Sequence, residues 1–118
     1  MTVCECYEKI GADYDEVIGR LMSEQLILKY LKRFCASGHV EDLKSYIAEQ
    51  HYEDAFRTAH IIKGICLNLA LTRLYDCSFA LCEALRTNPQ IKEIPDLLEA
   101  LLVEVQRVTS CVSEIDEQ

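Results

Sequence analysis

Three residues near the middle of the chain have the types and the spacing for phosphoryl chemistry. Lys63 and Gly64 follow His60 by three and four positions, the spacings that make two side chains neighbours on a helix surface. Neutral imidazole is a nucleophile near neutral pH, and a lysine ammonium is a suitable point charge beside a phosphoryl group. A glycine next to the imidazole removes a side chain, so a second protein can approach the histidine closely.

The stretch from Tyr52 to Leu69 has the apolar spacing of an amphipathic helix. Its apolar residues recur at steps of three and four, which predicts one buried face and places His60 on the side turned away from the core. A glycine inside a helix costs about 1 kcal/mol relative to alanine, so Gly64 indicates a need for clearance beside the imidazole. The predicted buried face consists of Ala55, Thr58, Ile62, Ile65 and Leu69, flanked by Ala59 and Cys66, and the opposite face carries Glu53, Arg57, His60, Lys63, Gly64 and Leu67, with Asn68 at its edge.

The sequence around His60 closely resembles a known family motif. Histidine phosphotransfer (HPt) domains carry the pattern A-H-x-L-K-G-x-x-x-N-[LI]-G, and the chain is similar to it at Ala59-His60-Ile61-Ile62-Lys63-Gly64 and Asn68-Leu69. Residues 10–34 look like the N-terminal helix region of that family, residues 36–50 like its second helix, and residues 74–86 like the helix after the motif. The resemblance implies an all-helical domain that exchanges a phosphoryl group with the aspartate of a response-regulator receiver domain.

The resemblance also implies a role for each matching residue. His60 matches the phosphoacceptor, which is modified on Nε2, Lys63 matches the lysine that offsets the negative charge, and Gly64 matches the glycine that leaves room for the partner. Asn68 matches in type, with hydrogen bonding at the helix end as an alternative role. In that family the receiver supplies Mg²⁺ and most of the catalytic groups, so no cofactor is expected in this chain. The expected partners are a receiver domain, a hybrid histidine kinase, or both.

The chain departs from the motif at Ala70, where the family usually has glycine. Glycine at that position would end the helix in a left-handed conformation. Alanine therefore predicts a different helix end, or a helix that runs slightly longer, and this departure concerns the local turn rather than the histidine.

Apolar residues beside His60 are candidates for partner binding. Phe56 and Leu67 lie next to His60 on the predicted exposed face, and we expect them to form an apolar patch that grips a helix of the receiver, together with Arg57 and Asn68. The alternative is that Phe56 and Leu67 pack into the neighbouring helices.

The rest of the pattern predicts an all-α fold. Four main helices are expected to form an antiparallel bundle, preceded by a short helical segment over Val3–Ile10, and residues 1–118 are expected to be a single HPt-like domain. The expected helix starts are Asp13, with Glu16 completing a pattern like a capping box, and Ser23, Thr72 and Ile94-Pro95-Asp96. The expected helix ends are Ser37-Gly38 and Asn88-Pro89.

Composition and charge exclude several classes of function. The net charge of −8 argues against nucleic-acid binding, which depends on Lys and Arg. No apolar run approaches the roughly 20 residues of a membrane span, and no charged and then apolar leader is seen, so we expect a cytoplasmic protein that is most simply a monomer. No nucleotide-binding or metalloprotease motif occurs, and the chain is therefore not expected to be an independent enzyme.

The cysteines need a separate explanation. The chain has seven of them, an odd number, at Cys4, Cys6, Cys35, Cys66, Cys77, Cys82 and Cys111. Most fall at apolar positions of expected helices, which favours reduced thiols that serve as small hydrophobic residues in a cytosolic protein. Cys4 and Cys6 leave open a metal site or a redox pair, although no second Cys or His pair follows at zinc-ligand spacing.

Three functions therefore compete. The first is a phosphorelay carrier, and the second is a helical module that docks a receiver or kinase without carrying phosphate. The third is a cysteine-rich metal or redox protein, which predicts bound metal or a reversible disulfide. The set of His60, Lys63 and Gly64 favours the carrier, because docking alone does not require it.

Overall fold

The computed structural model describes residues 1–89 and 92–116 of the chain. Within these ranges the chain forms seven α-helices and no strand, which confirms the all-α prediction. The helices are α1 (Val3–Ile10), α2 (Tyr14–Leu21), α3 (Glu24–Ala36), α4 (His39–Ala48), α5 (Tyr52–Asn68), α6 (Thr72–Thr87) and α7 (Ile94–Ser113).

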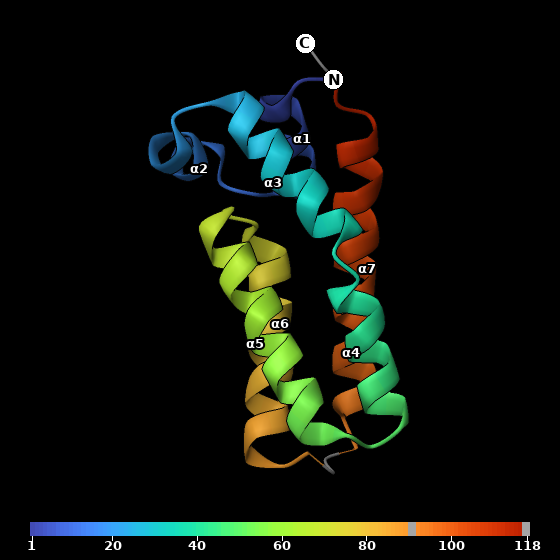
Figure 1. The fold of residues 1–118 in the computed structure, drawn as a ribbon. Coiled ribbons are helices and arrows are strands. Elements are labelled where there is room, and N and C mark those ends of the chain that lie inside the picture. Colours follow the sequence, from blue (N-terminus) through green and yellow to red (C-terminus); the bar gives the residue numbers. More distant parts are fainter. Residues whose placement is uncertain (90–91, 117–118) are drawn as a thin grey trace.

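Helices α4 to α7 form the predicted antiparallel bundle, as Figure 1 shows. The α5 and α6 helices make a tight hairpin, α4 packs against α5, and α7 packs against α6. The α3 helix packs against α7 beyond the start of α4, and α1 and α2 lie at the end of the bundle where both termini meet (Figure 1). The N-terminal part thus comprises three helices, and the whole molecule measures 45 × 21 × 19 Å.

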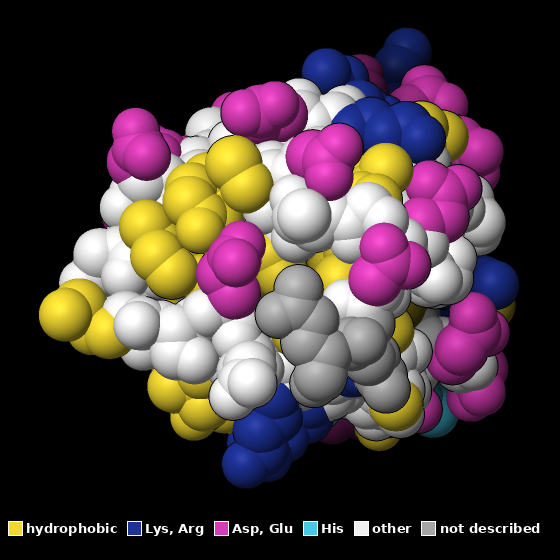
Figure 2. All heavy atoms as spheres, turned by 90° about the horizontal axis from the view of Figure 1, so that it is seen from above, with side chains coloured by type: hydrophobic (Ala, Val, Ile, Leu, Met, Phe, Trp, Pro, Cys, Tyr) yellow, Lys and Arg dark blue, Asp and Glu magenta, His cyan; other side chains and the backbone are white. Residues whose placement is uncertain are grey.

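The end of the molecule that carries the termini has a mixed surface. Figure 2 looks onto this end and shows acidic side chains scattered over it, with a group of hydrophobic side chains on the side where α2 lies. Met22, which follows α2, is 80% exposed. No helix in residues 1–89 and 92–116 has the length and apolar character that crossing a membrane requires.

Most of the predicted helix boundaries are confirmed, and the exceptions have local reasons. The side chains of Asp13 and Ser23 cap α2 and α3, each accepting from a backbone N–H three residues later. The carboxylate of Glu16 does not complete a capping box, because it binds Arg20 at 2.7 Å instead. The prediction for Thr72 is wrong, since Thr72 is the first residue of α6 and its side chain makes no capping bond.

The turn between α5 and α6 corrects the expectation drawn from Ala70. This alanine has a φ of 54°, so it takes the left-handed conformation in which glycine is usual. The N–H of Ala70 donates to the carbonyl of Leu67, and that of Leu71 donates to the carbonyl of Cys66, at 3.2 and 2.9 Å. These two bonds make a Schellman motif, so α5 ends at Asn68 as it would with glycine. A left-handed alanine costs roughly 1–2 kcal/mol.

Side chains from α1 and α2 hold the end of α5 in place. The hydroxyl of Tyr7 donates to the carbonyl of Leu69 at 2.7 Å. The guanidinium of Arg20 donates to the carbonyls of Leu67 and Asn68 at 2.8 and 2.7 Å. These carbonyls belong to the end of the helix, where the regular bonds to an N–H four residues later are missing, and a cation is favourable beside them because the helix dipole is negative at that end.

The inward face of α5 forms part of the core. Ala55, Ala59, Ile62 and Cys66 are fully buried, and Thr58 is buried with its hydroxyl bonded to the carbonyl of Asp54. The predicted buried face is thereby confirmed, apart from Ile65, which is only half-buried. Because this face anchors α5 along its length, the opposite face is held rigidly toward solvent.

We expect Glu104→Gln to lower the free energy of unfolding by about 1–2 kcal/mol. Glu104 is 8% exposed, and its carboxylate joins α6 to α7, accepting from Arg73 and Arg107 at 3.0 Å each. Glutamine removes the negative charge that both guanidinium groups face. Because the two arginine side chains are partly exposed to solvent, the loss of stability is limited. Urea denaturation measures the change, and Glu99→Gln, an exposed site on α7, should stay within about 0.5 kcal/mol of the unmodified protein. Equal midpoints for both variants would contradict a role for this pair of bridges.

Candidate functional site

His60 lies near the middle of α5 and is exposed. Within the described residues its imidazole makes no hydrogen bond and no ion pair, so neither ring nitrogen has a competing partner there. Its ring contacts that of Phe56, one turn earlier, at 6.1 Å between centroids and 54° between planes. The helix therefore presents an unencumbered imidazole whose position is fixed by the buried face behind it.

Lys63 follows His60 by one turn and leans toward α6. Its Nζ lies 5.5 Å from the centroid of the Phe79 ring, which is a cation–π distance. The nearby Glu83 is engaged by Arg86 at 2.6 Å, and this hydrogen bond is the main reason that the pKa of Glu83 is lowered, with the charge of Lys63 a smaller cause. In the described part of the chain Lys63 makes no ion pair, so its charge is not neutralised by a carboxylate.

Gly64 lies at a position where the described residues leave space for a side chain. A Cβ added at this position would meet no atom within 4 Å, and its φ is not in the left-handed region. Neither packing within the chain nor the backbone conformation requires glycine there. The helical cost of about 1 kcal/mol is therefore offset by nothing in the described residues, which agrees with clearance for something outside the molecule.

Apolar side chains from two helices surround this group. Leu67 is 52% exposed, so it does not pack into a neighbouring helix, whereas Phe56 is half-buried. The structure adds Phe79 of α6, which is 46% exposed and 6.2 Å from the ring of Tyr75. We call His60, Lys63, Gly64, Phe56, Leu67 and Phe79 the acceptor face.

The sequence alone did not reveal Phe79. It lies on another helix, and the spacing of apolar residues in α6 does not show which of its faces lies beside Lys63. A usable signal is that Phe79 is off the buried stripe formed by Leu74, Ser78, Leu81, Cys82 and Leu85.

Arg57 and Asn68 lie at the rim of this surface. Arg57 is bound to Glu53 at 2.6 Å and also approaches Asp54 at 3.5 Å. Asn68 is exposed at the last turn of α5 and faces a pocket beside α3 rather than the α6 side. The two therefore do not belong to the apolar part of the acceptor face.

All seven cysteines are free thiols, and burial shapes their chemistry. Burial raises the pKa of Cys6 and Cys66 to about 12 each, and it is also the first cause of a raised pKa at Cys4, Cys35, Cys77 and Cys82. In the part of the chain that the structure describes, no group of three or more Cys, His, Asp or Glu is placed to hold a metal ion.

We expect slow alkylation of the folded protein. A raised pKa leaves less thiolate at pH 7.5 than a free cysteine has, and the thiolate is the reacting form. Cys35 is exposed and Cys4 and Cys77 are partly buried, so these three should react with iodoacetamide at rates below that of glutathione, and the four buried cysteines only after unfolding. Mass spectrometry of time points measures this. A thiol that reacts faster than glutathione would revive the redox alternative.

Comparison of the sequence with models of known protein families identifies one family. The sequence model of the Hpt domain matches residues 30–117, about three quarters of the chain. The matched range contains α4 to α7 and the whole acceptor face, while α1 and α2 precede it. No match was found among curated proteins or among solved structures. The chain belongs to the Hpt domain family, whose members are phosphotransfer modules.

Proposed function

We propose that this protein carries a phosphoryl group on Nε2 of His60, to or from the aspartate of a response-regulator receiver domain. The observation that carries the proposal is the exposed imidazole of His60, free of hydrogen bonds within the described residues and flanked by Lys63 and Gly64. Membership of the Hpt family supports the same role.

The transfer step needs little from this chain beyond positioning. The lone pair of Nε2 attacks phosphorus, the P–N bond forms, and the P–O bond of the aspartyl phosphate breaks, so that the carboxylate leaves with the electron pair. The proton on Nδ1 stays on the ring. Lys63 lies one turn away, where its ammonium offsets the charge of the bound phosphoryl group. Phosphoryl transfer of this kind depends mainly on alignment and charge stabilisation.

The proposed carrier needs no cofactor of its own. In this proposal the receiver supplies Mg²⁺ and the carboxylates that hold it, and a hybrid histidine kinase is the alternative donor. The chain contributes the nucleophile, one cation and a docking surface. It acts as a phosphoryl carrier rather than an independent enzyme.

We also propose that residues 1–118 act as one domain and as a monomer. The bonds from Tyr7 and Arg20 to the end of α5 make α1 and α2 part of the structural unit that holds His60, although they precede the family match. A single cooperative unfolding transition, with a sedimentation mass of one chain, is the expected result.

The test is phosphoryl transfer from a panel of phosphorylated receiver domains. The expected product is a label on this protein that is lost in acid and kept in base, the behaviour of a phosphoramidate. Transfer from at least one receiver supports the proposal. If a receiver binds but no label is transferred, the docking module is favoured instead. If no receiver binds and no label is transferred, both the carrier and the docking module are ruled out.

Leu67→Asp should weaken receiver binding at least tenfold while leaving the fold intact. Leu67 is 52% exposed, so a carboxylate there stays solvated in the free protein but must be desolvated against an apolar partner. Calorimetric titration with the receiver that transfers measures the affinity. Val103→Asp on α7, which replaces another residue that is 51% exposed, is the control and should bind normally. Unchanged affinity for Leu67→Asp would remove Leu67 from the docking surface.

A further inference from the structure

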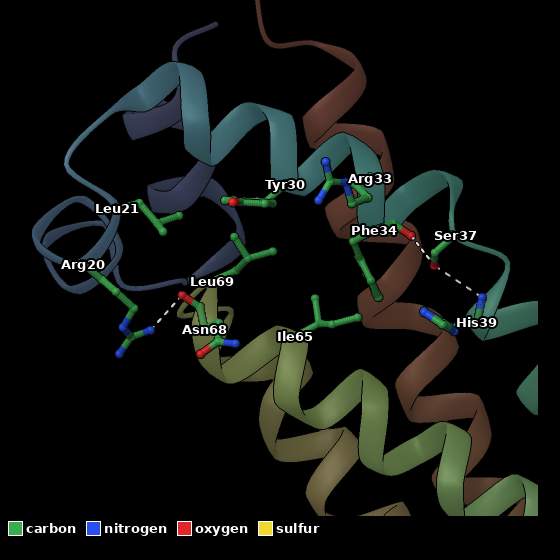
Figure 3. A pocket seen from close by; sticks show the side chains of 10 residues that line it. All are labelled: Arg20, Leu21, Tyr30, Arg33, Phe34, Ser37, His39, Ile65, Asn68 and Leu69. Carbon is green, nitrogen blue, oxygen red and sulfur yellow. Dashed lines mark hydrogen bonds between the residues drawn. The ribbon is translucent and has the colours of Figure 1, made fainter.

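A pocket of about 430 Å³ lies between α2, α3 and α5, beside the end of the helix that carries His60. Figure 3 shows it from close by. Its volume falls within the range of roughly 300–1,000 Å³ that is usual for small-molecule sites. The lining residues are Arg20, Leu21, Tyr30, Arg33, Phe34, Ser37, His39, Ile65, Asn68 and Leu69.

The inner wall of this pocket is apolar. The side chains of Leu21, Phe34, Ile65 and Leu69 come from three helices and point toward one space, with the ring of Tyr30 above it (Figure 3). Phe34 and Leu69 are almost fully buried, whereas Ile65 is only half-buried, which is the one exception on the core face of α5. A ligand with an apolar body would therefore cover surface that the fold leaves open.

The charged residues that line the pocket are cationic, in a chain whose net charge is −8. None of the described Asp and Glu residues lines it. Arg20 is already engaged by Glu16 and by the carbonyls at the end of α5. Arg33 differs, because its guanidinium lies 5.3 Å from the centroid of the Tyr30 ring and makes no ion pair within the described residues. One guanidinium thus remains available at the rim.

We propose that this pocket binds a small amphipathic carboxylate, with its apolar body on the wall of Leu21, Phe34 and Ile65 and its carboxylate on Arg33. A single planar guanidinium matches a planar carboxylate through two parallel hydrogen bonds. The proposal goes beyond phosphoryl transfer, since it uses neither His60 nor Lys63. Arg20 and Leu21 also precede residue 30, where the family match begins, so membership of the family does not account for these walls.

The probes are two pairs of matched compounds: 2-naphthoate with 2-naphthamide, and octanoate with octanamide. We expect the carboxylates to bind with a dissociation constant of about 1 mM or tighter and the neutral amides at least tenfold more weakly. Nuclear magnetic resonance titration of the labelled protein reports the site directly, and the shifts should be centred on Tyr30, Ile65 and Leu69. Saturable shifts at the acceptor face instead would contradict the proposal.

Variants separate the two parts of the proposed contact. Arg33→Gln should weaken naphthoate at least tenfold and leave naphthamide unchanged, and Ile65→Trp should weaken both by filling the pocket. Arg86→Gln makes the same substitution on α6, outside the lining set, and should change neither. Equal binding of carboxylate and amide, full affinity in Arg33→Gln, or no saturable shift with any probe would overturn the proposal.

The same variants distinguish a small molecule from a protein partner. If no carboxylate binds, but Arg33→Gln and Ile65→Trp lose receiver binding, the pocket belongs to the receiver footprint and the ligand proposal is wrong. The titrations contain no phosphate donor, so the absence of ligand binding would not count against the carrier function. In the same way, the absence of phosphoryl transfer would not affect what the titrations show about the pocket.

Discussion

His60→Gln is expected to accept no phosphoryl label from any receiver that labels the unmodified protein. Glutamine has no nucleophilic nitrogen at neutral pH, and a lysine ammonium such as that of Lys63 has no lone pair with which to attack phosphorus. The side chain is exposed and unbonded within the described residues, so its replacement should change stability by less than about 0.5 kcal/mol. Labelling and urea denaturation of the same preparation separate lost chemistry from lost fold.

The chain supplies its own matched controls for this experiment. It has three histidines, and the other two lie away from the acceptor face. His51 precedes α5 and is 3.9 Å from Glu49, and His39 begins α4 and lines the pocket beside α3. His39→Gln and His51→Gln should both be labelled normally. Residual label in His60→Gln that disappears when His39→Gln or His51→Gln is added would place the phosphoryl group on that other histidine. This result would contradict the proposed mechanism.

Much of the fold was predictable because it depends on local signals. The helix that carries His60 follows from apolar spacing alone, and its buried residues, such as Ile62 and Cys66, lie where the period places them. The caps at Asp13 and Ser23 work through residues three positions away. The sequence also places His60 on the solvent side, because one buried stripe fixes the opposite face.

Other features required the tertiary structure. The pattern at Thr72 looks like a cap, but the Schellman turn before it sets the start of α6 and leaves the hydroxyl with only a 3.5 Å contact to the carbonyl of Ala70. Ala70 looked like a changed helix end, yet the bonds of that turn hold the alanine in a left-handed conformation. In both cases the hydrogen bonds of the turn decided the conformation against the preference of the single residue.

Contacts between distant helices were equally out of reach of sequence patterns. Phe79 joins the acceptor face because α6 packs beside α5, and Arg20 reaches the end of α5 across 47 and 48 positions of sequence. Periodicity within one helix gives the direction of a side chain relative to its own axis and not the neighbour that it meets. The placement of His60, Lys63 and Gly64 on α5 was therefore predictable, whereas their surroundings on α2, α3 and α6 were not.

Gly64→Gln is expected to raise stability and lower function at once. Glutamine is a good helix former, and the space around Gly64 is open within the described residues, so the free energy of unfolding should rise by about 0.5–1 kcal/mol. The new side chain stands one turn from the imidazole, in the space through which a receiver aspartate must approach. We expect the rate of phosphoryl transfer to fall at least tenfold, measured by rapid mixing with the phosphorylated receiver, with binding weakened as well.

A second glycine provides the control for this variant. Gly19 lies inside α2, is exposed and also has nothing within 4 Å of an added Cβ. Gly19→Gln should gain a similar amount of stability, and it should transfer at the normal rate because it stands on another helix. If Gly64→Gln transfers as fast as Gly19→Gln, glycine beside the histidine does not provide clearance. If both gain stability and only Gly64→Gln loses transfer, Gly64 is retained despite its helical cost because the partner needs the space beside His60.

Gly64→Ala, which adds a single methyl group, should then gain stability and lose less of the transfer rate than Gly64→Gln, because the obstruction scales with the size of the side chain.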